Sequence, residues 1–139
     1  MDAIVFSGAD PRLESEIETG RDSGLHFRSV ADIDRYALIR GARAVLFPSI
    51  YEAFGLPVIE AMALGTLVVT SDGSSLTEVE GDAALLVESY SIDSIAWAIR
   101  AIEADIDLRK ELADRGRQQA KKFSPSAYDE RLRRLYEKL

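Results

Sequence analysis

Residues 44–70 read AVLFPSIYEAFGLPVIEAMALGTLVVT, and the order of features in this stretch decides the fold class. Two short apolar runs, Ala44–Phe47 and Leu67–Thr70, have the composition of strands buried on both faces. Between them, Pro57 suits a first helical turn and Gly65 suits the position just past a helix end. The stretch therefore predicts strand, loop, short helix and strand, which is the repeating unit of a parallel α/β sheet.

The same alternation extends along the chain in both directions. Further apolar runs at Ala3–Phe6, Leu25–Arg28 and Ala84–Val87 bring the predicted strands to about five. Helices are expected at these places: from about Pro11 to Asp22; up to Gly41; after the capping box of Ser75 and Glu78; along Ile92, Ile95, Ala96, Ile99 and Ile102; and after Ser124-Pro125 along Tyr128, Leu132, Leu135, Tyr136 and Leu139. We expect an α/β, Rossmann-like, three-layer α/β/α fold with a mostly parallel sheet, spanning residues 1–139 as a single domain.

Composition excludes several classes of protein. The 139 residues are 47% hydrophobic, contain no Cys and one His, and carry a net charge of −7. Disulfides and cysteine-based metal sites are excluded, and a nucleic-acid partner is disfavoured by the negative charge. No apolar run approaches the roughly 20 residues of a membrane span. We therefore expect a cytoplasmic protein without a transmembrane segment.

Charge is unevenly distributed along the chain. Residues 1–108 contain 7 Lys+Arg against 19 Asp+Glu, whereas residues 109–139 contain 10 against 5, and the first lysine is Lys110. Phosphate sites usually include a nearby cation, so the scarcity of Lys and Arg in residues 1–108 counts against a phosphate site there. The basic C-terminal stretch is interpreted mainly as solvated helix faces.

Some chemically suggestive residues have simpler explanations. Asp32-Ile33-Asp34 and Asp105-Ile106-Asp107 spell the D-x-D pattern of metal-dependent sugar transferases, but acidic residues at these spacings are more typical of helix starts. His26 lies in a strand pattern without a partner at catalytic spacing and is interpreted as an ordinary strand residue. Trp97, flanked by isoleucines, is predicted to lie in the core or at its rim.

The loop between Phe47 and Pro57 has the chemistry of an anion site. It follows a buried strand and enters a helix, which is where open α/β sheets bind ligands. The positive end of a helix favours phosphate, and unpaired backbone N–H groups there can bind it. Such N–H groups are expected near Phe54, Gly55, Leu56 and Val58.

Two carboxylates flank this loop. Glu52 belongs to the loop and Glu60 to the first turns of the helix, so both can border one cleft and accept hydrogen bonds from hydroxyl groups. A ligand with phosphate and sugar hydroxyls, such as a nucleotide sugar, would match both features. On spacing alone, a surface-loop Glu52 and a helix-start Glu60 without function explain the pattern about equally well.

The motif around these carboxylates is specific. Glu52 and Glu60, with seven residues between them inside FPS…EAFGLP…EAMALGTLVV, resemble the E-x7-E signature of the family-four retaining glycosyltransferases, or glycosyl transferases group 1, which have the GT-B fold. Leu76–Val79, Gly81–Val87 and Phe123-Ser124-Pro125 are similar to later elements of that family, whereas Ile4–Gly8 and Tyr36–Ala42 fit more loosely.

The resemblance implies that the chain is most of a C-terminal, donor-binding half of a GT-B enzyme. It implies that Glu52 is catalytic, in an electrostatic and positioning role beside the donor sugar, and that Glu60 binds the ribose. Phe54, Gly55 and Leu56 would contact the sugar and diphosphate, and residues 27–30 would lie beside the base. It also implies a nucleotide-sugar donor, a saccharide or lipid-linked acceptor, and no metal or other cofactor.

The chain also departs from the family pattern. The family's diphosphate-binding Arg and Lys and the first strand of this domain lie upstream of the segment that resembles Ala3–Phe6. We therefore expect the chain alone to be incomplete as a catalyst, to need an acceptor-binding domain or a partner chain, and to expose a sheet edge that could form a homodimer. Two alternatives stay open: a non-catalytic oligomerisation or interaction module with this half-fold, and a fragment of a nucleotide-sugar epimerase.

Overall fold

The computed structural model describes residues 5–7, 25–27, 32–51, 53–72 and 76–138. The chain forms two compact units, Met1–Ala37 and Leu38–Leu139. In the first, β1 (Val5–Ser7) and β2 (Leu25–Phe27) pair in parallel, with Phe6 opposite His26. His26 thus lies within a strand, as predicted. The helix predicted from Pro11 to Asp22 lies outside the described residues, and the single domain over residues 1–139 stays a prediction.

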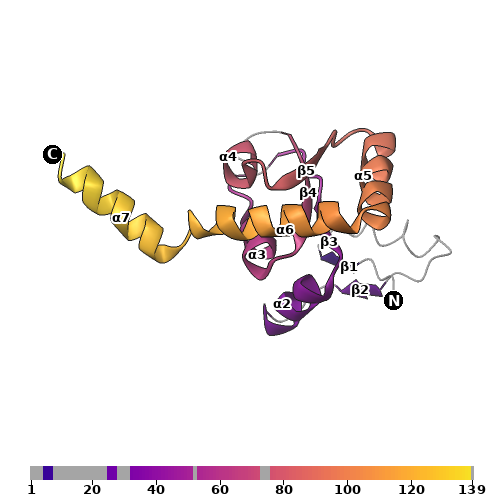
Figure 1. The fold of residues 1–139 in the computed structure, drawn as a ribbon, viewed down its shortest axis with the longest axis horizontal. Coiled ribbons are helices and arrows are strands. Elements are labelled where there is room, and N and C mark those ends of the chain that lie inside the picture. The colour runs from indigo at the N-terminus through magenta and orange to yellow at the C-terminus, as the bar shows by residue number, and fades with distance from the viewer. Residues whose placement is uncertain (1–4, 8–24, 28–31, 52, 73–75, 139) are drawn as a thin grey trace. The chain divides into compact units, whose positions relative to one another are not determined.

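A three-stranded parallel sheet is the centre of the second unit (Figure 1). Its strands are β3 (Ala44–Phe47), β4 (Leu67–Ser71) and β5 (Ala84–Val87), in the order β3-β4-β5. All five residues of β4 are buried because a strand covers each of its edges and helices cover its faces, whereas β3 and β5 are only partly buried. The predicted strand positions are confirmed, but the described strands form sheets of two and three rather than one sheet.

Helices alternate with these strands. The described helices are α2 (Asp32–Gly41), α3 (Leu56–Leu64), α4 (Leu76–Glu80), α5 (Ile92–Ala104), α6 (Ile106–Lys121) and α7 (Pro125–Tyr136). The ends predicted for α2 and α3 at Gly41 and Gly65 are confirmed, whereas Ser75 lies outside the described residues. Neither α4 nor any other helix in the described ranges combines the length and apolarity that crossing a bilayer requires.

Side-chain oxygens fix the starts of the last three helices. Ser91, Asp105 and Ser124 accept hydrogen bonds from the amides of Ser94 (3.1 Å), Leu108 (2.8 Å) and Ala127 (3.2 Å). Each bond satisfies a backbone donor that a helix start leaves unpaired. Asp105 is therefore a helix cap, as its position in the D-x-D pattern predicted.

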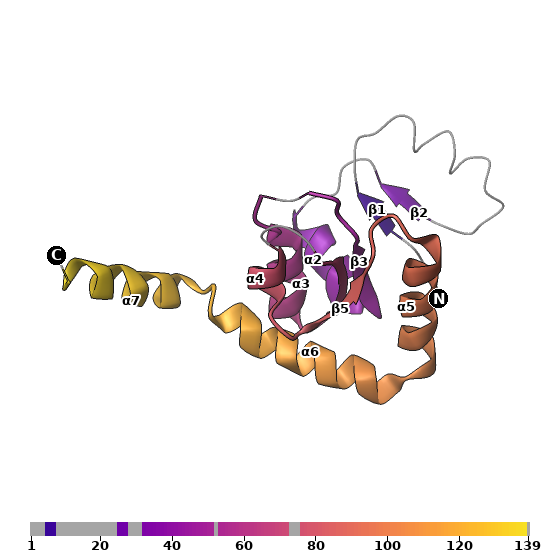
Figure 2. The same cartoon turned by 90° about the horizontal axis from the view of Figure 1, so that it is seen from above.

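Two hydrophobic clusters cover the two faces of the sheet. Successive residues of β4 point to opposite faces, so Val68 enters one cluster while Leu67 and Val69 enter the other. The first cluster contains residues of α3 and α4, the second contains residues of α5, and α6 contributes to both. Figure 2 shows α6 running from the end of α5 past α3 and α4. The three-layer α/β/α arrangement is thus confirmed for this unit.

Apolar residues of two helices, α5 and α7, are less buried than the sequence predicts. Trp97 on α5 is 54% exposed and Ile92 is 84% exposed, because the buried face of α5 centres on Ala98 and Ile102. Trp97 was predicted to lie in the core or at its rim, and this exposure excludes the core. The predicted stripe from Tyr128 to Tyr136 lies on α7, no residue of which is buried, and Leu139 lies outside the described residues. Both views show α7 leading away from α3 and α6 (Figures 1 and 2).

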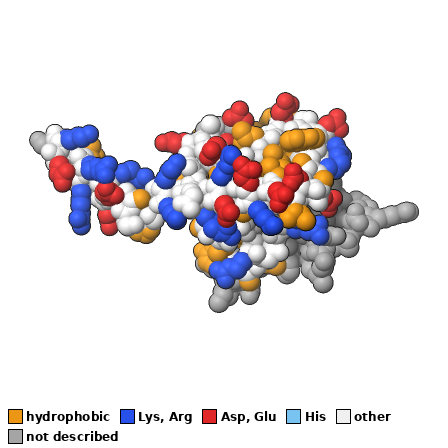
Figure 3. Space-filling view, in the orientation of Figure 1, with side chains coloured by type: hydrophobic (Ala, Val, Ile, Leu, Met, Phe, Trp, Pro, Cys, Tyr) orange, Lys and Arg blue, Asp and Glu red, His pale blue; other side chains and the backbone are white. Residues whose placement is uncertain are grey.

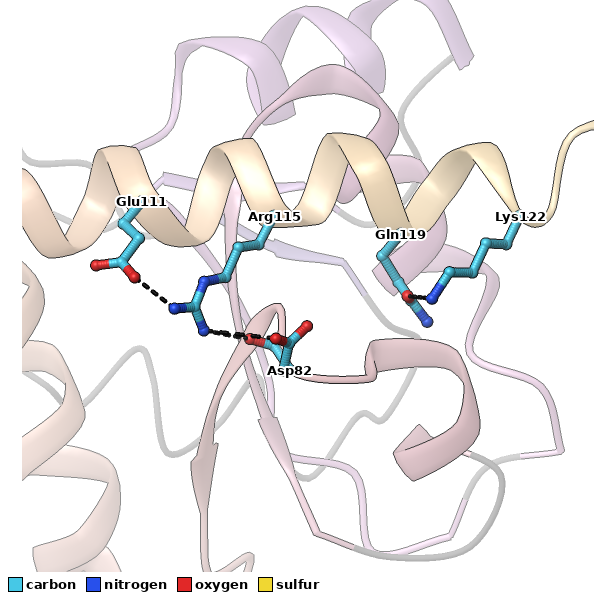
Figure 4. Close-up of polar contacts among 5 residues, drawn as sticks. All are labelled: Asp82, Glu111, Arg115, Gln119 and Lys122. Atoms are coloured by element: carbon cyan, nitrogen blue, oxygen red, sulfur yellow. Dashed lines mark hydrogen bonds and ion pairs between the residues drawn. The ribbon is translucent and has the colours of Figure 1, made fainter.

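Polar side chains of α6 form hydrogen bonds to the end of α4 and to the turn between α4 and β5 (Figure 4). Arg115 donates to the Asp82 carbonyl oxygen (3.4 Å) and pairs with the Glu111 carboxylate at 2.5 Å. Gln119 donates to the Val79 carbonyl (3.0 Å) and accepts from Lys122 Nζ at 2.7 Å. The carbonyl at the end of the short helix α4, which that helix cannot satisfy itself, is therefore bonded from α6.

The end of α3 provides a test of this local structure. Gly65 has φ 76°, and the Arg117 guanidinium occupies the place that a Cβ would take. Gly65→Ala is expected to lower the free energy of unfolding by about 1 kcal/mol, because a side chain is strained in this left-handed conformation. Urea unfolding followed by circular dichroism measures it. Gly41→Ala is the control, since nothing lies within 4 Å of that position, and equal losses in both variants would contradict the assignment.

Candidate functional site

A glycine turn connects the sheet to α3 at the carboxyl edge of the strands. In this Gly55 turn (residues 53–56), Gly55 has φ 76° and ψ 42° and forms the N-cap of α3 without a side-chain hydrogen bond. Within the described part of the chain, the amides of Phe54, Gly55 and Leu56 donate no hydrogen bond. They lie at the positive end of the α3 dipole, which favours anions, and anion binding at this turn stays a prediction.

Val58 does not contribute to this arrangement. Its amide donates to the Gly55 carbonyl at 3.0 Å, and its side chain is fully buried in the first hydrophobic cluster. The left-handed conformation of Gly55 turns its carbonyl toward the following helical turn, where Ile59 also bonds to it at 3.4 Å. The expectation of an unpaired amide at Val58 was wrong.

Hydroxyl groups from the neighbouring strands hold the segment that leads into the Gly55 turn. Thr70 Oγ1 donates to the Phe47 carbonyl at 3.1 Å. The Ser49 carbonyl accepts from the buried Ser71 hydroxyl and also from Ser89 Oγ at 3.2 Å. These hydroxyl groups were not identified from the sequence. The only sequence feature that could have indicated them is their position at or just after the end of a predicted strand. The segment is therefore anchored to β4 and to the loop after β5.

An aromatic contact supports the turn from the other side. The rings of Phe54 and Phe123 meet edge to face, with centroids 6.2 Å apart and planes at 81°. Phe123 lies where α6 gives way to α7. Edge-to-face pairs contribute roughly 0.5–1.5 kcal/mol beyond their buried area. Phe54 remains 47% exposed.

Of the two predicted carboxylates, the structure describes Glu60 but not Glu52. Glu60 lies on α3 one turn after Leu56, so the two share a helix face, and Glu60 is half-buried with its Oε2 atom inside the protein. Glu52 lies outside the described residues, as do residues 28–30 of the predicted base site, while Phe27 ends β2. The pairing of Glu52 with Glu60 stays a prediction.

A third carboxylate was missed by sequence reasoning. Glu80 at the end of α4 is fully buried, and within the described residues neither of its carboxylate oxygens has a hydrogen-bond partner. Burial, and secondarily the nearby charge of Asp72, raise the pKa of Glu80 to about 7. Asp72 directly follows β4 and accepts a hydrogen bond from Thr77 Oγ1 at 3.3 Å. Below this pH, the fold thus encloses a neutral carboxylic acid at the end of α4.

The described residues contain no cluster of three or more acidic or histidine side chains suited to a metal ion. Metal-independent chemistry stays a prediction.

The chain is similar to known sugar transferases. The family model for glycosyl transferases group 1 matches residues 22–119. O-antigen chain mannosyltransferase B of Escherichia coli is 43% identical over 127 residues, covering 87% of this chain and 33% of that protein. The MMP alpha-(1->4)-mannosyltransferase of Mycolicibacterium hassiacum is 36% identical over 108 residues, covering 74% and 26%. The chain therefore spans a third or less of the length of these relatives.

Two solved structures superpose on this chain and have the same fold. Sucrose-phosphate synthase from Thermosynechococcus elongatus superposes with a TM-score of 0.82 at 27% identity, covering 98% of this chain and 37% of that one. Anabaena HepE, whose crystal structure contains UDP and glucose, superposes with a TM-score of 0.74 at 20% identity, covering 99% and 40%. The Rossmann-like half-fold is thus shown independently of the sequence motif.

Proposed function

Because the chain belongs to the glycosyl transferases group 1 family, we propose that it binds the nucleotide-sugar donor of a retaining glycosyltransferase at the Gly55 turn. The observation that carries this proposal is the geometry of the turn. The amides of Phe54, Gly55 and Leu56 lie at the positive end of α3, about one helical turn before Glu60, and donate no hydrogen bond within the described residues. A diphosphate matches the amides, and sugar hydroxyls match a carboxylate.

Each residue has a distinct role in this proposal. The amides of Gly55 and Leu56 hold the diphosphate and stabilise the negative charge that develops as it departs. Glu60 accepts hydrogen bonds from the ribose hydroxyls. Glu52 positions the transferred sugar and stabilises positive charge near its reacting carbon. The exposed face of Phe54 contacts the sugar or the diphosphate.

The transferred sugar is proposed to be mannose. Two relatives that are 43% and 36% identical to this chain are named as mannosyltransferases, and both alignments cover more than two thirds of it. The acceptor-binding portion lies, on this proposal, outside these 139 residues, since the chain spans a third or less of those relatives. Neither the interaction module nor the epimerase fragment is favoured by any of these similarities.

Calorimetric titration of the full chain with nucleoside diphosphate mannose tests the proposal. We expect saturable binding with a dissociation constant of about 1 mM or tighter. Free mannose at the same concentration serves as the control and should give no saturable heat, because it lacks the diphosphate that the amides bind. The corresponding glucose donor tests the sugar assignment separately. Absence of binding by every nucleoside diphosphate sugar at several times this concentration would contradict donor binding.

A further inference from the structure

A second concave site lies at the opposite edge of the sheet. A cavity of about 390 Å³ is lined by Ala42, which precedes β3, and by Gly65, Thr66 and Leu67, which lead into β4. These residues mark the amino ends of the strands, whereas the Gly55 turn follows a carboxyl end. The volume lies within the range of roughly 300–1,000 Å³ that is typical of small-molecule sites.

Basic side chains dominate the lining of this cavity. Five cations line it against a single carboxylate: Arg40, Arg43, Arg109, Lys110 and Arg117, with Asp114. Figure 3 shows basic side chains on the face turned to the viewer, with acidic side chains among them. The whole chain carries a net charge of −7, so this concentration of positive charge runs against its overall composition.

Ion pairs within the described residues do not account for three of these cations. Arg117 pairs with Asp114 at 2.5 Å, but within the described residues Arg40, Arg109 and Lys110 form no ion pair. The Ile39 carbonyl near the end of α2 already accepts from Thr66 Oγ1 at 2.7 Å and from the Ala42 amide at 3.2 Å. The last carbonyl groups of α3 likewise accept hydrogen bonds from the amides of Gly65 and Thr66. Neither helix end therefore needs these cations as a cap.

Helix dipoles do not explain the basic residues of α6 either. Arg109 and Lys110 lie near the start of α6, where the positive end of the dipole disfavours cations. The cavity-facing residues of α6 follow one helical face, spaced by three or four from Ile106 to Arg117. That face lies beside the buried stripe that includes Leu112 and Gly116.

We propose that this cavity binds the phosphoryl group of a phosphorylated small molecule or of a lipid headgroup. Guanidinium groups from α2 and α6 converge on it with the fork geometry that matches phosphate oxygens. The site is separate from the Gly55 turn because the two lie at opposite ends of the same strands.

Titration of the full chain with inorganic pyrophosphate, followed by calorimetry and by amide NMR, tests the proposal. We expect the amides of Gly65 and Thr66 to shift on binding. The double variant Arg109→Gln/Lys110→Gln should bind at this site about 10-fold more weakly. Arg40→Gln, on a different helix, should weaken binding in the same direction. The matched control, Arg133→Gln/Lys138→Gln, removes two exposed charges from the region of α7 and should stay within about 2-fold of the wild type.

Vesicles separate the two sources of the phosphoryl group. Binding to phosphatidylglycerol vesicles, absent with phosphatidylcholine vesicles and lost in Arg109→Gln/Lys110→Gln, identifies a lipid headgroup. Pyrophosphate binding without vesicle binding identifies a soluble phosphorylated molecule. The proposal is overturned if the Gly65 and Thr66 amides do not move, or if the cavity variants and the control show the same pyrophosphate affinity when it is measured from the shifts of these two amides, since pyrophosphate is also expected to bind at the Gly55 turn.

Discussion

Replacing Glu60 by glutamine is expected to weaken binding of the nucleoside diphosphate sugar by about 10- to 100-fold, because hydrogen bonds to a charged group are each worth about 1.5–3 kcal/mol. The variant keeps the size and shape of the side chain while removing the charge. Glu60 is half-buried on α3, one turn after the first residue of that helix. Calorimetric titration of both proteins with the same donor measures the loss.

Two controls distinguish a binding role from a structural one. Glu103→Gln makes the same chemical change at an exposed position of α5 and should leave donor affinity unchanged. Urea unfolding of Glu60→Gln should show that the fold is intact at the temperature of the titration. Donor affinity equal to that of the wild type in Glu60→Gln would remove the assigned role of this carboxylate.

Replacing Glu80 by glutamine is expected to stabilise the protein above neutral pH by about 3 kcal/mol. The fold buries the neutral carboxylic acid and raises the pKa of Glu80 from 4.5 to about 7. Deprotonation above that pH places an unpaired charge in a fully buried position. Glutamine has a similar shape and carries no charge at any pH, so the variant avoids this penalty.

The contribution of Glu80 to the free energy of unfolding changes with pH in one direction. Between pH 4.5 and about 7, the folded protein keeps the Glu80 proton while the unfolded chain releases it. The free energy of unfolding therefore falls with rising pH across this window, as far as Glu80 contributes to it. Urea unfolding at pH 4 and pH 8 measures the effect, and Glu80→Gln should flatten the difference. Glu88→Gln, an exposed control, should leave it unchanged. A difference that is the same in all three proteins would contradict the account.

Local signals predicted the elements that position the site. Pro57 and Gly65 bracket α3 because one suits a first helical turn and the other adopts the left-handed conformation that ends it. The strands Ala44–Phe47 and Ala84–Val87 coincide with their apolar runs. The amides of Phe54, Gly55 and Leu56, which have no partner within the described residues, followed from the same logic, since the start of a helix always leaves donors without an internal partner.

Features that depend on tertiary contacts could not be predicted in this way. Ser71 and Ser89 meet at the Ser49 carbonyl only because parallel strands bring their carboxyl ends to one edge. Burial of Glu80 depends on how α4 lies in the fold, and its sequence position suggests an ordinary exposed helix residue. The cations of the second cavity are up to 77 positions apart, from Arg40 to Arg117, and no local spacing connects them.

The central claim concerns the amides of the Gly55 turn, and an amide NMR titration of the full chain with the nucleoside diphosphate of the donor tests it most directly. We predict that the signals of Phe54, Gly55 and Leu56 move saturably and that Glu60→Gln weakens the titration. Saturation of binding without movement of these three signals would contradict the account.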